Sequence, residues 1–284
     1  MEDSQDKTPT TTYEEPISDV RKAASKASRN YLKKNALRIA LGLIIWTFIA
    51  FAISPYINED IIPAFFIGPF LILLLLYYQV YTDTLSRFWK EFAAKKAWSY
   101  VEAGDPKKEE ALMFEHGQEN TISNIVSGSI DNRPLRIFSY SFRIRRSRGA
   151  DSAYKYTVFG IKFSGHFPHL YLNYHHDNFN QTIGERISLP LEFEKRFSLF
   201  APKEYEMEAH QIFSPSLLSY LLDNNLQYDL ELVNGELLIF VNRFMNNPKE
   251  LEEELDRAYK LAQKLAPTLD DFRFQEIGNY PTSL

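Results

Sequence analysis

The sequence predicts an α+β protein, in which an N-terminal transmembrane helical hairpin is followed by an antiparallel β-sheet domain closed by helices. Three observations support this class. Two long apolar runs occupy residues 39–57 and 61–81, period-two alternation dominates the segments between residues 124 and 200, and helical periodicity with capping residues returns towards the C-terminus. Separate regions of strand and helix patterning are typical of α+β domains.

Each apolar run is about as long as a membrane is thick. Ile39–Ile57 and Ile61–Tyr81 contain no charged residue, and only Asn58, Glu59 and Asp60 separate them. A hydrocarbon core about 30 Å thick needs roughly 20 helical residues to cross it. The two runs are therefore predicted to form a transmembrane helical hairpin. The alternative is a pair of helices buried in a soluble core, where apolar helical runs are usually shorter.

The charges beside the two runs predict their orientation. Seven basic residues and no acidic residue lie from Arg21 to Arg38, four basic residues lie from Arg87 to Lys96, and the turn between the runs carries only acidic charge. Lys and Arg beside a span stay on the cytoplasmic side. We therefore expect a protein of the cell (inner) membrane with two spans and both termini in the cytoplasm. Neither run contains an ionisable residue, which favours an anchor over an ion pathway.

The rest of the chain divides by composition. Residues 1–20 are polar and acidic, which predicts a disordered tail. Residues 21–38 form a basic juxtamembrane segment, which is either an interfacial helix attracted to anionic lipid or simply the flanking charge of the first span. Residues 82–104 are predicted to continue the second span as an amphipathic helical extension. Residues 105–284 form the cytoplasmic α+β domain, or two smaller domains divided near Pro202.

Local motifs set several boundaries within this domain. Ser214-Pro215 begins a helix, and Asn234-Gly235 is typical of the turn of a β-hairpin. Asn247-Pro248 caps and begins the last helix, which Pro267 is expected to end. The strands predicted from alternation are Asn124–Ser129, Leu135–Ile144, Tyr154–Phe163, Leu170–Tyr174, Phe197–Phe200, Tyr228–Val233 and Glu236–Val241, and a further helix is expected over Lys203–Ile212.

Four arginines gather at a predicted hairpin tip: Arg143, Arg145, Arg146 and Arg148. Alternation along a strand directs Arg143 and Arg145 to the same face. Guanidinium groups offer forked donors to oxyanions, so the cluster is a candidate site for a phosphate, a lipid head group or an acidic partner. The alternative is an exposed strand end whose charges prevent aggregation. Nucleic acid is not expected, because the net charge is −5 and the pI about 5.8.

Histidines gather in the middle of the same domain. His166, His169, His175 and His176, followed by Asp177, are a candidate metal site, since imidazole and carboxylate are zinc ligands. The adjacent pair His175-His176 would point to opposite faces of a strand, and no H-E-x-x-H spacing is present. A metal site is therefore not the preferred interpretation, and no cofactor is expected.

Common catalytic motifs are absent from the sequence. It contains no G-x-S-x-G, G-x-x-x-x-G-K-[ST] or G-x-G-x-x-G motif. It also contains no cysteine, which excludes a disulfide framework, a thiolate metal site and a cysteine nucleophile. No catalytic residue is assigned on this basis.

Three motifs in the second half of the chain are similar to those of a known family. Residues 191–197 read LEFEKRF, residues 200–206 read FAPKEYE, and residues 212–218 read IFSPSLL. In this order they resemble a bacterial family of uncharacterised proteins with two N-terminal membrane helices and a cytoplasmic domain of unknown function. The resemblance implies the same organisation here, and it supplies no catalytic residue because the family has no assigned activity.

Together these features predict a membrane-anchored cytoplasmic binding or scaffolding module with no reaction of its own. The expected partners are the lipid bilayer and either a protein or an anionic lipid head group. Two alternatives remain: a membrane-tethered metal-dependent hydrolase that uses the histidines, and an accessory subunit of a transporter.

Overall fold

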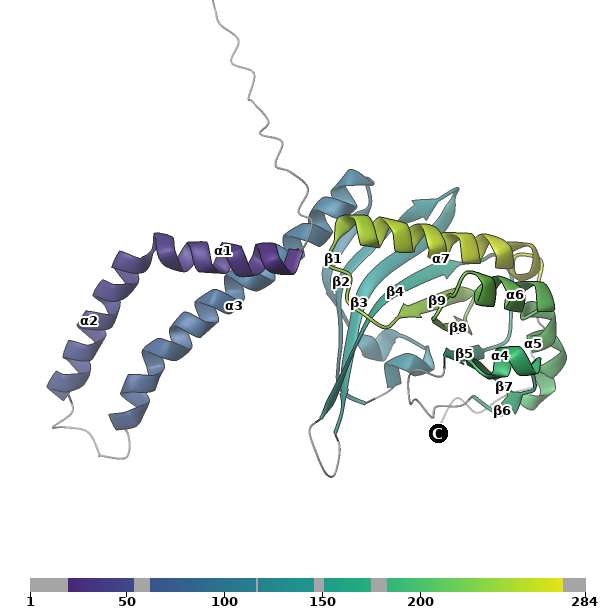
Figure 1. Cartoon of the computed structure of the whole chain (residues 1–284), viewed down its shortest axis with the longest axis horizontal. Coiled ribbons are helices and arrows are strands. Elements are labelled where there is room, and N and C mark those ends of the chain that lie inside the picture. Colours follow the sequence, from purple (N-terminus) through teal and green to yellow (C-terminus); the bar gives the residue numbers. More distant parts are fainter. Residues whose placement is uncertain (1–19, 54–61, 116, 146–150, 175–182, 273–284) are drawn as a thin grey trace, which may run out of the picture. The chain divides into compact units, whose positions relative to one another are not determined.

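The predicted α+β class is confirmed by the computed structural model (Figure 1). Its contacts divide the chain into two compact units. One unit comprises Met1–Thr84 with Asn247–Lys249, and the other comprises Leu85–Asn246 with Glu250–Leu284. The structure describes residues 20–53, 62–115, 117–145, 151–174 and 183–272.

Helices α1, α2 and α3 make up the described part of the first unit. α1 spans Val20–Lys34, α2 spans Ala36–Ile53, and α3 spans Ile62–Lys95, the last turns of which belong to the second unit. α2 and α3 run side by side (Figure 1), and a Cβ atom at Gly68 of α3 would lie 3.5 Å from the Trp46 ring of α2. The two apolar stretches are thus neighbours in space as well as in sequence.

Large apolar side chains remain exposed on α2 and α3. Leu37 is 82% exposed, Phe51 79% and Phe70 68%. In the described part of the chain, no single helix is both long and apolar enough to cross a membrane. One pair of helices meets that requirement together, by length and composition only. The pair is Ala24–Lys34 with Ala36–Ala52, and its two helices are bent by 63° from one another. The large exposed apolar residues of the described chain that lie outside Leu37–Tyr78 are Tyr31, Val101, Leu191 and Met207.

The second unit is built on a sheet of nine strands among the described residues. Its order is β1-β2-β3-β4-β9-β8-β5-β7-β6, and neighbouring strands pair antiparallel. Every strand predicted from alternation is found, and β1 and β6 are added. The strands are β1 Ser99–Gly104, β2 Gln118–Ile130, β3 Arg133–Ile144, β4 Ser152–Lys162, β5 Leu170–Tyr174, β6 Glu185–Ile187, β7 Phe197–Ala201, β8 Asp229–Val233 and β9 Glu236–Val241.

The predicted helical extension over residues 82–104 was wrong at its C-terminal end. α3 ends at Lys95, where the Trp98 amide donates to the Ala93 carbonyl (2.9 Å) and closes the last turn. Ser99–Gly104 pairs with β2 instead of continuing the helix. The pairing partner lies well downstream in the sequence, so the local helical period could not reveal it.

Helices and short 3-10 helices cover the sheet. α7 (Pro248–Leu269) lies across one face (Figure 1) and buries an apolar stripe that includes Leu251. The 3-10 helix η4 (Leu112–Glu115) places the Phe114 ring against Tyr140 of β3, with ring centroids 4.8 Å apart. The remaining covering elements are η3 Pro106–Lys108, α4 Leu191–Glu194, η5 Lys203–Tyr205, α5 Glu206–Ile212 and α6 Pro215–Asp223.

The last helix continues to Leu269, past the residue that was expected to end it. Pro267 lies in the final turn, where its missing amide costs one hydrogen bond. Tertiary contacts hold the chain just beyond this point, since the Arg133 guanidinium donates two hydrogen bonds (3.0 and 2.6 Å) to the Asp270 carboxylate. The Ser164 amide donates to the same carboxylate (3.2 Å). These contacts explain why the helix extends beyond the proline.

The Asp270 carboxylate makes the stability of this anchor dependent on pH. Hydrogen bonds from Arg133 lower the pKa of Asp270 from 3.8 to about 2, against the opposing effect of burial. Because the folded-state pKa is depressed, the contribution to stability is present above about pH 4 and is lost as the pH falls towards 2. We expect Asp270→Asn to lower the Tm near neutral pH and to match the wild type near pH 2, measured by circular dichroism. A Tm difference independent of pH in this range would contradict the ion pair's role.

Candidate functional site

The arginine cluster lies where β3 and β4 approach their connecting turn. Arg143 pairs with Glu119 (Nη1–Oε2 3.0 Å), and Arg145 approaches the other oxygen of that carboxylate (3.8 Å). The two guanidinium groups therefore reach one face, as the alternation predicts. All three side chains are more than half exposed, at 58%, 67% and 51%, so each ion pair contributes less than about 1 kcal/mol. Arg146 and Arg148 lie outside the described residues.

An irregular stretch of β2 brings Glu119 to these arginines. The register of β2 against β3 shifts between Gln118 and Thr121, and Glu119 adopts a left-handed backbone conformation with φ 57°. A β-bulge of this kind re-aims one side chain out of the regular alternation. A residue other than glycine in this conformation costs on the order of 1 kcal/mol, and such strain concentrates at functional sites. The bulge is therefore part of the candidate site.

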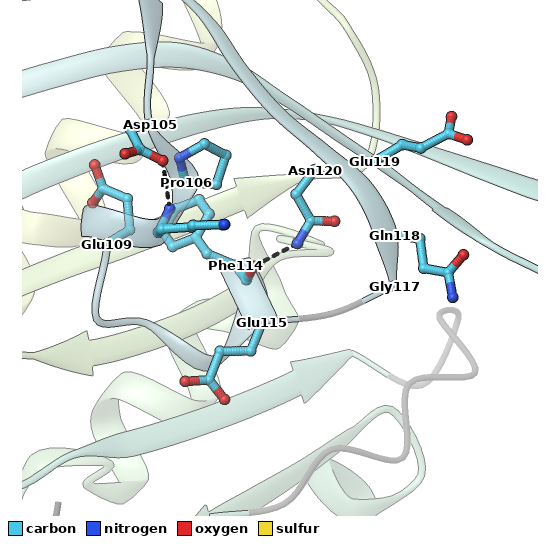
Figure 2. Close-up of a pocket in the computed structure, with 10 residues that line it drawn as sticks. Asp105, Pro106, Glu109, Phe114, Glu115, Gly117, Gln118, Glu119 and Asn120 are labelled. Atoms are coloured by element: carbon cyan, nitrogen blue, oxygen red, sulfur yellow. Dashed lines mark hydrogen bonds between the residues drawn. The ribbon is translucent and has the colours of Figure 1, made fainter. Parts of the chain in front are cut away.

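A pocket of about 600 Å³ opens beside the bulge (Figure 2). Three of its carboxylates already have partners. Glu119 pairs with the two arginines, Asp105 caps η3 by accepting from a backbone amide (3.1 Å), and Glu109 binds Arg136 through both oxygens (2.8 and 2.7 Å). Asn120 donates to a backbone carbonyl (2.7 Å), while its Oδ1 is buried and meets no donor among the described residues. Because four carboxylates and one lysine line it, the pocket is suited to a ligand that donates hydrogen bonds. Its lining residues are Asp105, Pro106, Lys107, Glu109, Phe114, Glu115, Gly117, Gln118, Glu119 and Asn120.

The structure describes part of the histidine cluster. Residues 175–177 lie outside the described chain, and His166 is exposed. His169, just before β5, places its Nε2 2.6 Å from Oε1 of Glu231. Among the described residues, no group of three or more His, Cys, Asp or Glu side chains is placed to hold a metal ion. The contact of His169 is thus with one buried carboxylate.

Glu231 is fully buried in β8 and gathers donors from two other segments. Besides His169, the amides of Leu112 (2.6 Å) and Met113 (3.3 Å) donate to its carboxylate. The Tyr140 hydroxyl donates to the Met113 carbonyl (2.8 Å). Burial is the larger cause, and the Glu231 charge the smaller, of a raised pKa of Tyr140. An imidazole whose Nε2 donates to a carboxylate keeps Nδ1 as an acceptor. The arrangement ties η4 to the sheet and can orient His169 for a ligand or a proton.

A second buried carboxylate, Glu254 of α7, lies beside another polar pocket. The Tyr228 hydroxyl and the Arg243 guanidinium (3.1 Å) donate to it, and Arg257 lies 3.5 Å away. Burial, followed by the hydrogen bond to Glu254, raises the pKa of Tyr228. The adjoining cavity of about 350 Å³ is also lined by Asp229, which accepts from a β5 backbone amide (2.6 Å). Arg243 and Arg257 also line this cavity, so its two arginines offset the charge of its two carboxylates, Asp229 and Glu254.

The buried carboxylates of β8 are not among the residues predicted from the sequence, although the pairing of the β8–β9 hairpin indicates them. The Asn234-Gly235 turn sets Glu231 opposite Leu238 and Asp229 opposite Phe240. Directly paired residues of an antiparallel pair lie on the same face of the sheet. Carboxylates whose cross-strand neighbours are apolar core residues are therefore expected on the buried face, where they need partners.

Comparison with known proteins gives little to place beside this geometry. No protein-family model and no curated protein matches the chain. Among solved structures, it is similar to the crystal structure of the mycobacterial trehalose monomycolate transport factor A, TtfA. The TM-score is 0.47 and the identity 13%, with 64% of this chain and 93% of that chain covered. A likeness at this level assigns neither a family nor a function.

Removal of the Glu231 carboxylate is expected to weaken the fold. Glu231→Ala leaves the amides of Leu112 and Met113 and the His169 ring without their acceptor, so the free energy of unfolding should fall by about 3–5 kcal/mol. Glu231→Gln keeps one oxygen acceptor and should cost less. Denaturant unfolding measures the loss, and hydrogen exchange at Leu112 and Met113 reports release of η4.

Glu206→Ala is the control, since Glu206 is exposed on α5 and its removal should change the free energy of unfolding by less than about 0.5 kcal/mol. Equal stability of Glu231→Ala and this control, with unchanged exchange at η4, would contradict the anchoring role of Glu231.

Proposed function

We propose that the chain is a membrane-anchored cytoplasmic binding or scaffolding module with no reaction of its own. The observation that carries this proposal is the concentration of exposed large apolar side chains between Leu37 and Tyr78 on α2 and α3. Contiguous apolar surface of this kind is rare on soluble monomers, whereas a bilayer core surrounds it with apolar groups. The two helices would anchor the chain in the cell membrane, and the basic residues beside them favour cytoplasmic termini.

The end of the β3–β4 hairpin is the part of the domain proposed to meet a partner. Arg143 and Arg145 pair with a single exposed carboxylate, Glu119, which an acidic group of a partner can displace at low cost. The adjoining pocket (Figure 2) contributes carboxylates that accept hydrogen bonds, Glu115 and Glu119 among them. A protein surface supplies both acidic groups and hydrogen-bond donors, so a protein partner fits this end of the domain best.

The anchor and its orientation are testable by single-cysteine labelling, because the chain has no cysteine of its own. Asp60→Cys lies between the two apolar runs, and Met207→Cys replaces a residue of the domain that is 83% exposed. In intact cells, we expect a membrane-impermeant maleimide to label Asp60→Cys and to label Met207→Cys only after lysis. The chain should also stay in the membrane pellet after an alkaline carbonate wash. Release by carbonate would contradict the anchor, and labelling of Met207→Cys in intact cells would reverse the orientation.

The binding end is testable by native mass spectrometry of the full chain purified in mild detergent. Arg143→Gln with Arg145→Gln should lower the recovery of a stoichiometric protein partner several-fold, about the effect of losing one or two charge-assisted contacts. Glu119→Gln should raise the recovery, because it removes the carboxylate that competes for both arginines.

Other results of this experiment would favour the alternative functions. A larger membrane protein retained equally by all three variants would indicate an accessory subunit of a transporter. Zinc retained by the wild type and lost in His175→Ala with His176→Ala would indicate the hydrolase.

A further inference from the structure

One face of α1 carries a continuous row of basic side chains. Lys22, Lys26, Arg29 and Lys33 are exposed and follow one another at spacings of three and four residues, which places them on a single helix face. The row extends along about 16 Å of helix axis. No acidic residue lies from Arg21 to Arg38, so this segment of the sequence carries basic charge alone.

The opposite face of α1 packs against α3. Ala24 and Ser28 are fully buried there. Ser28 Oγ donates to the Tyr77 carbonyl (3.1 Å), and the Tyr77 hydroxyl donates to Ser25 Oγ (3.3 Å). These contacts fix the rotation of α1 about its axis. The basic row is thereby directed away from α3.

The contact with Tyr77 also fixes the level of α1 along α3. Tyr77 lies near the C-terminal end of the apolar stretch of α3, and its ring stacks with that of Tyr81 (centroids 6.4 Å apart). Tyrosine rings are typical of the membrane interface, between hydrocarbon and head groups. α1 is bent by 63° from α2 (Figure 1), so it turns away from the direction of the apolar helices at this level. With α2 and α3 in the bilayer, as in the proposed anchor, a helix in this position would run along the membrane surface.

We propose that Lys22, Lys26, Arg29 and Lys33 of α1 form a binding surface for the head groups of anionic phospholipids. This inference rests on the proposed membrane anchor. Lysine and arginine stems can lie along apolar surface while their charges reach phosphate oxygens, and basic residues beside a span are attracted to an anionic leaflet. Anionic lipid is favoured over other acidic partners because the Tyr77 contacts hold the row at head-group level.

The proposal is tested with the full chain in mild detergent, titrated with phosphatidylglycerol or phosphatidylcholine and followed by native mass spectrometry. The wild type should bind phosphatidylglycerol more tightly, and this preference should weaken at high salt, since the Debye length falls from about 10 Å at 0.1 M to about 3 Å at 1 M. The fourfold variant Lys22→Gln, Lys26→Gln, Arg29→Gln, Lys33→Gln should lose the preference by about tenfold or more. Glutamine preserves helix propensity, so α1 should still form.

A matched control removes the same charge from the second unit. Lys195→Gln, Lys203→Gln, Lys260→Gln and Lys264→Gln replace four exposed lysines and should leave the preference unchanged. An equal loss in both variants would overturn the proposal in favour of a net-charge effect, and so would a preference in the wild type that is absent or insensitive to salt. A carbonate wash separates the two hypotheses. Release of the wild type refutes the anchor itself, whereas a retained chain without lipid preference refutes the role of α1 alone.

Discussion

Every residue of β8 and β9 is buried, and this constraint governs how the second unit is held together. Three of these residues are carboxylates, and a buried charge without a partner costs several kcal/mol. Each therefore takes donors from outside the hairpin. Asp229 uses the β5 backbone, Glu231 uses His169 and the η4 amides, and Glu236 uses Arg136 of β3. The covering segments are attached to the sheet at defined polar points, in addition to apolar packing.

In the first unit, unlike the second, much apolar surface stays exposed. Its small residues, Ala24 and Ser28 among them, bring α1 against α3, while the large apolar side chains of α2 and α3 remain exposed. The second unit differs, since its large exposed apolar residues among those described are Val101, Leu191 and Met207. In the proposed function, the helices would anchor the chain and the sheet domain would present the groups that recognise a partner. In the sequence, the basic row of α1 lies just before the first apolar run.

Strand periodicity in the sequence predicts some contacts of the candidate sites and not others. Strand alternation placed Arg143 and Arg145 on one face, and both reach the same carboxylate. It could not indicate that Glu119 supplies this carboxylate, because a bulge takes that residue out of the regular alternation. The partner of His169 was also hidden. Glu231 lies 62 positions from His169 in the sequence. The spacing between the histidines therefore gives no indication that this carboxylate is the partner of His169.

By itself, the sequence determined what depends on neighbours a few positions apart. The Asn234-Gly235 turn, the Ser214-Pro215 helix start and the alternation of the strands express local backbone geometry, and the structure contains all of them. Only the tertiary structure decided the order of the sheet, the strand at Ser99–Gly104 and the course of the last helix past Pro267. Each of these depends on contacts between distant segments, such as β1 with β2 or Arg133 with Asp270, and their free energy overrides local preference.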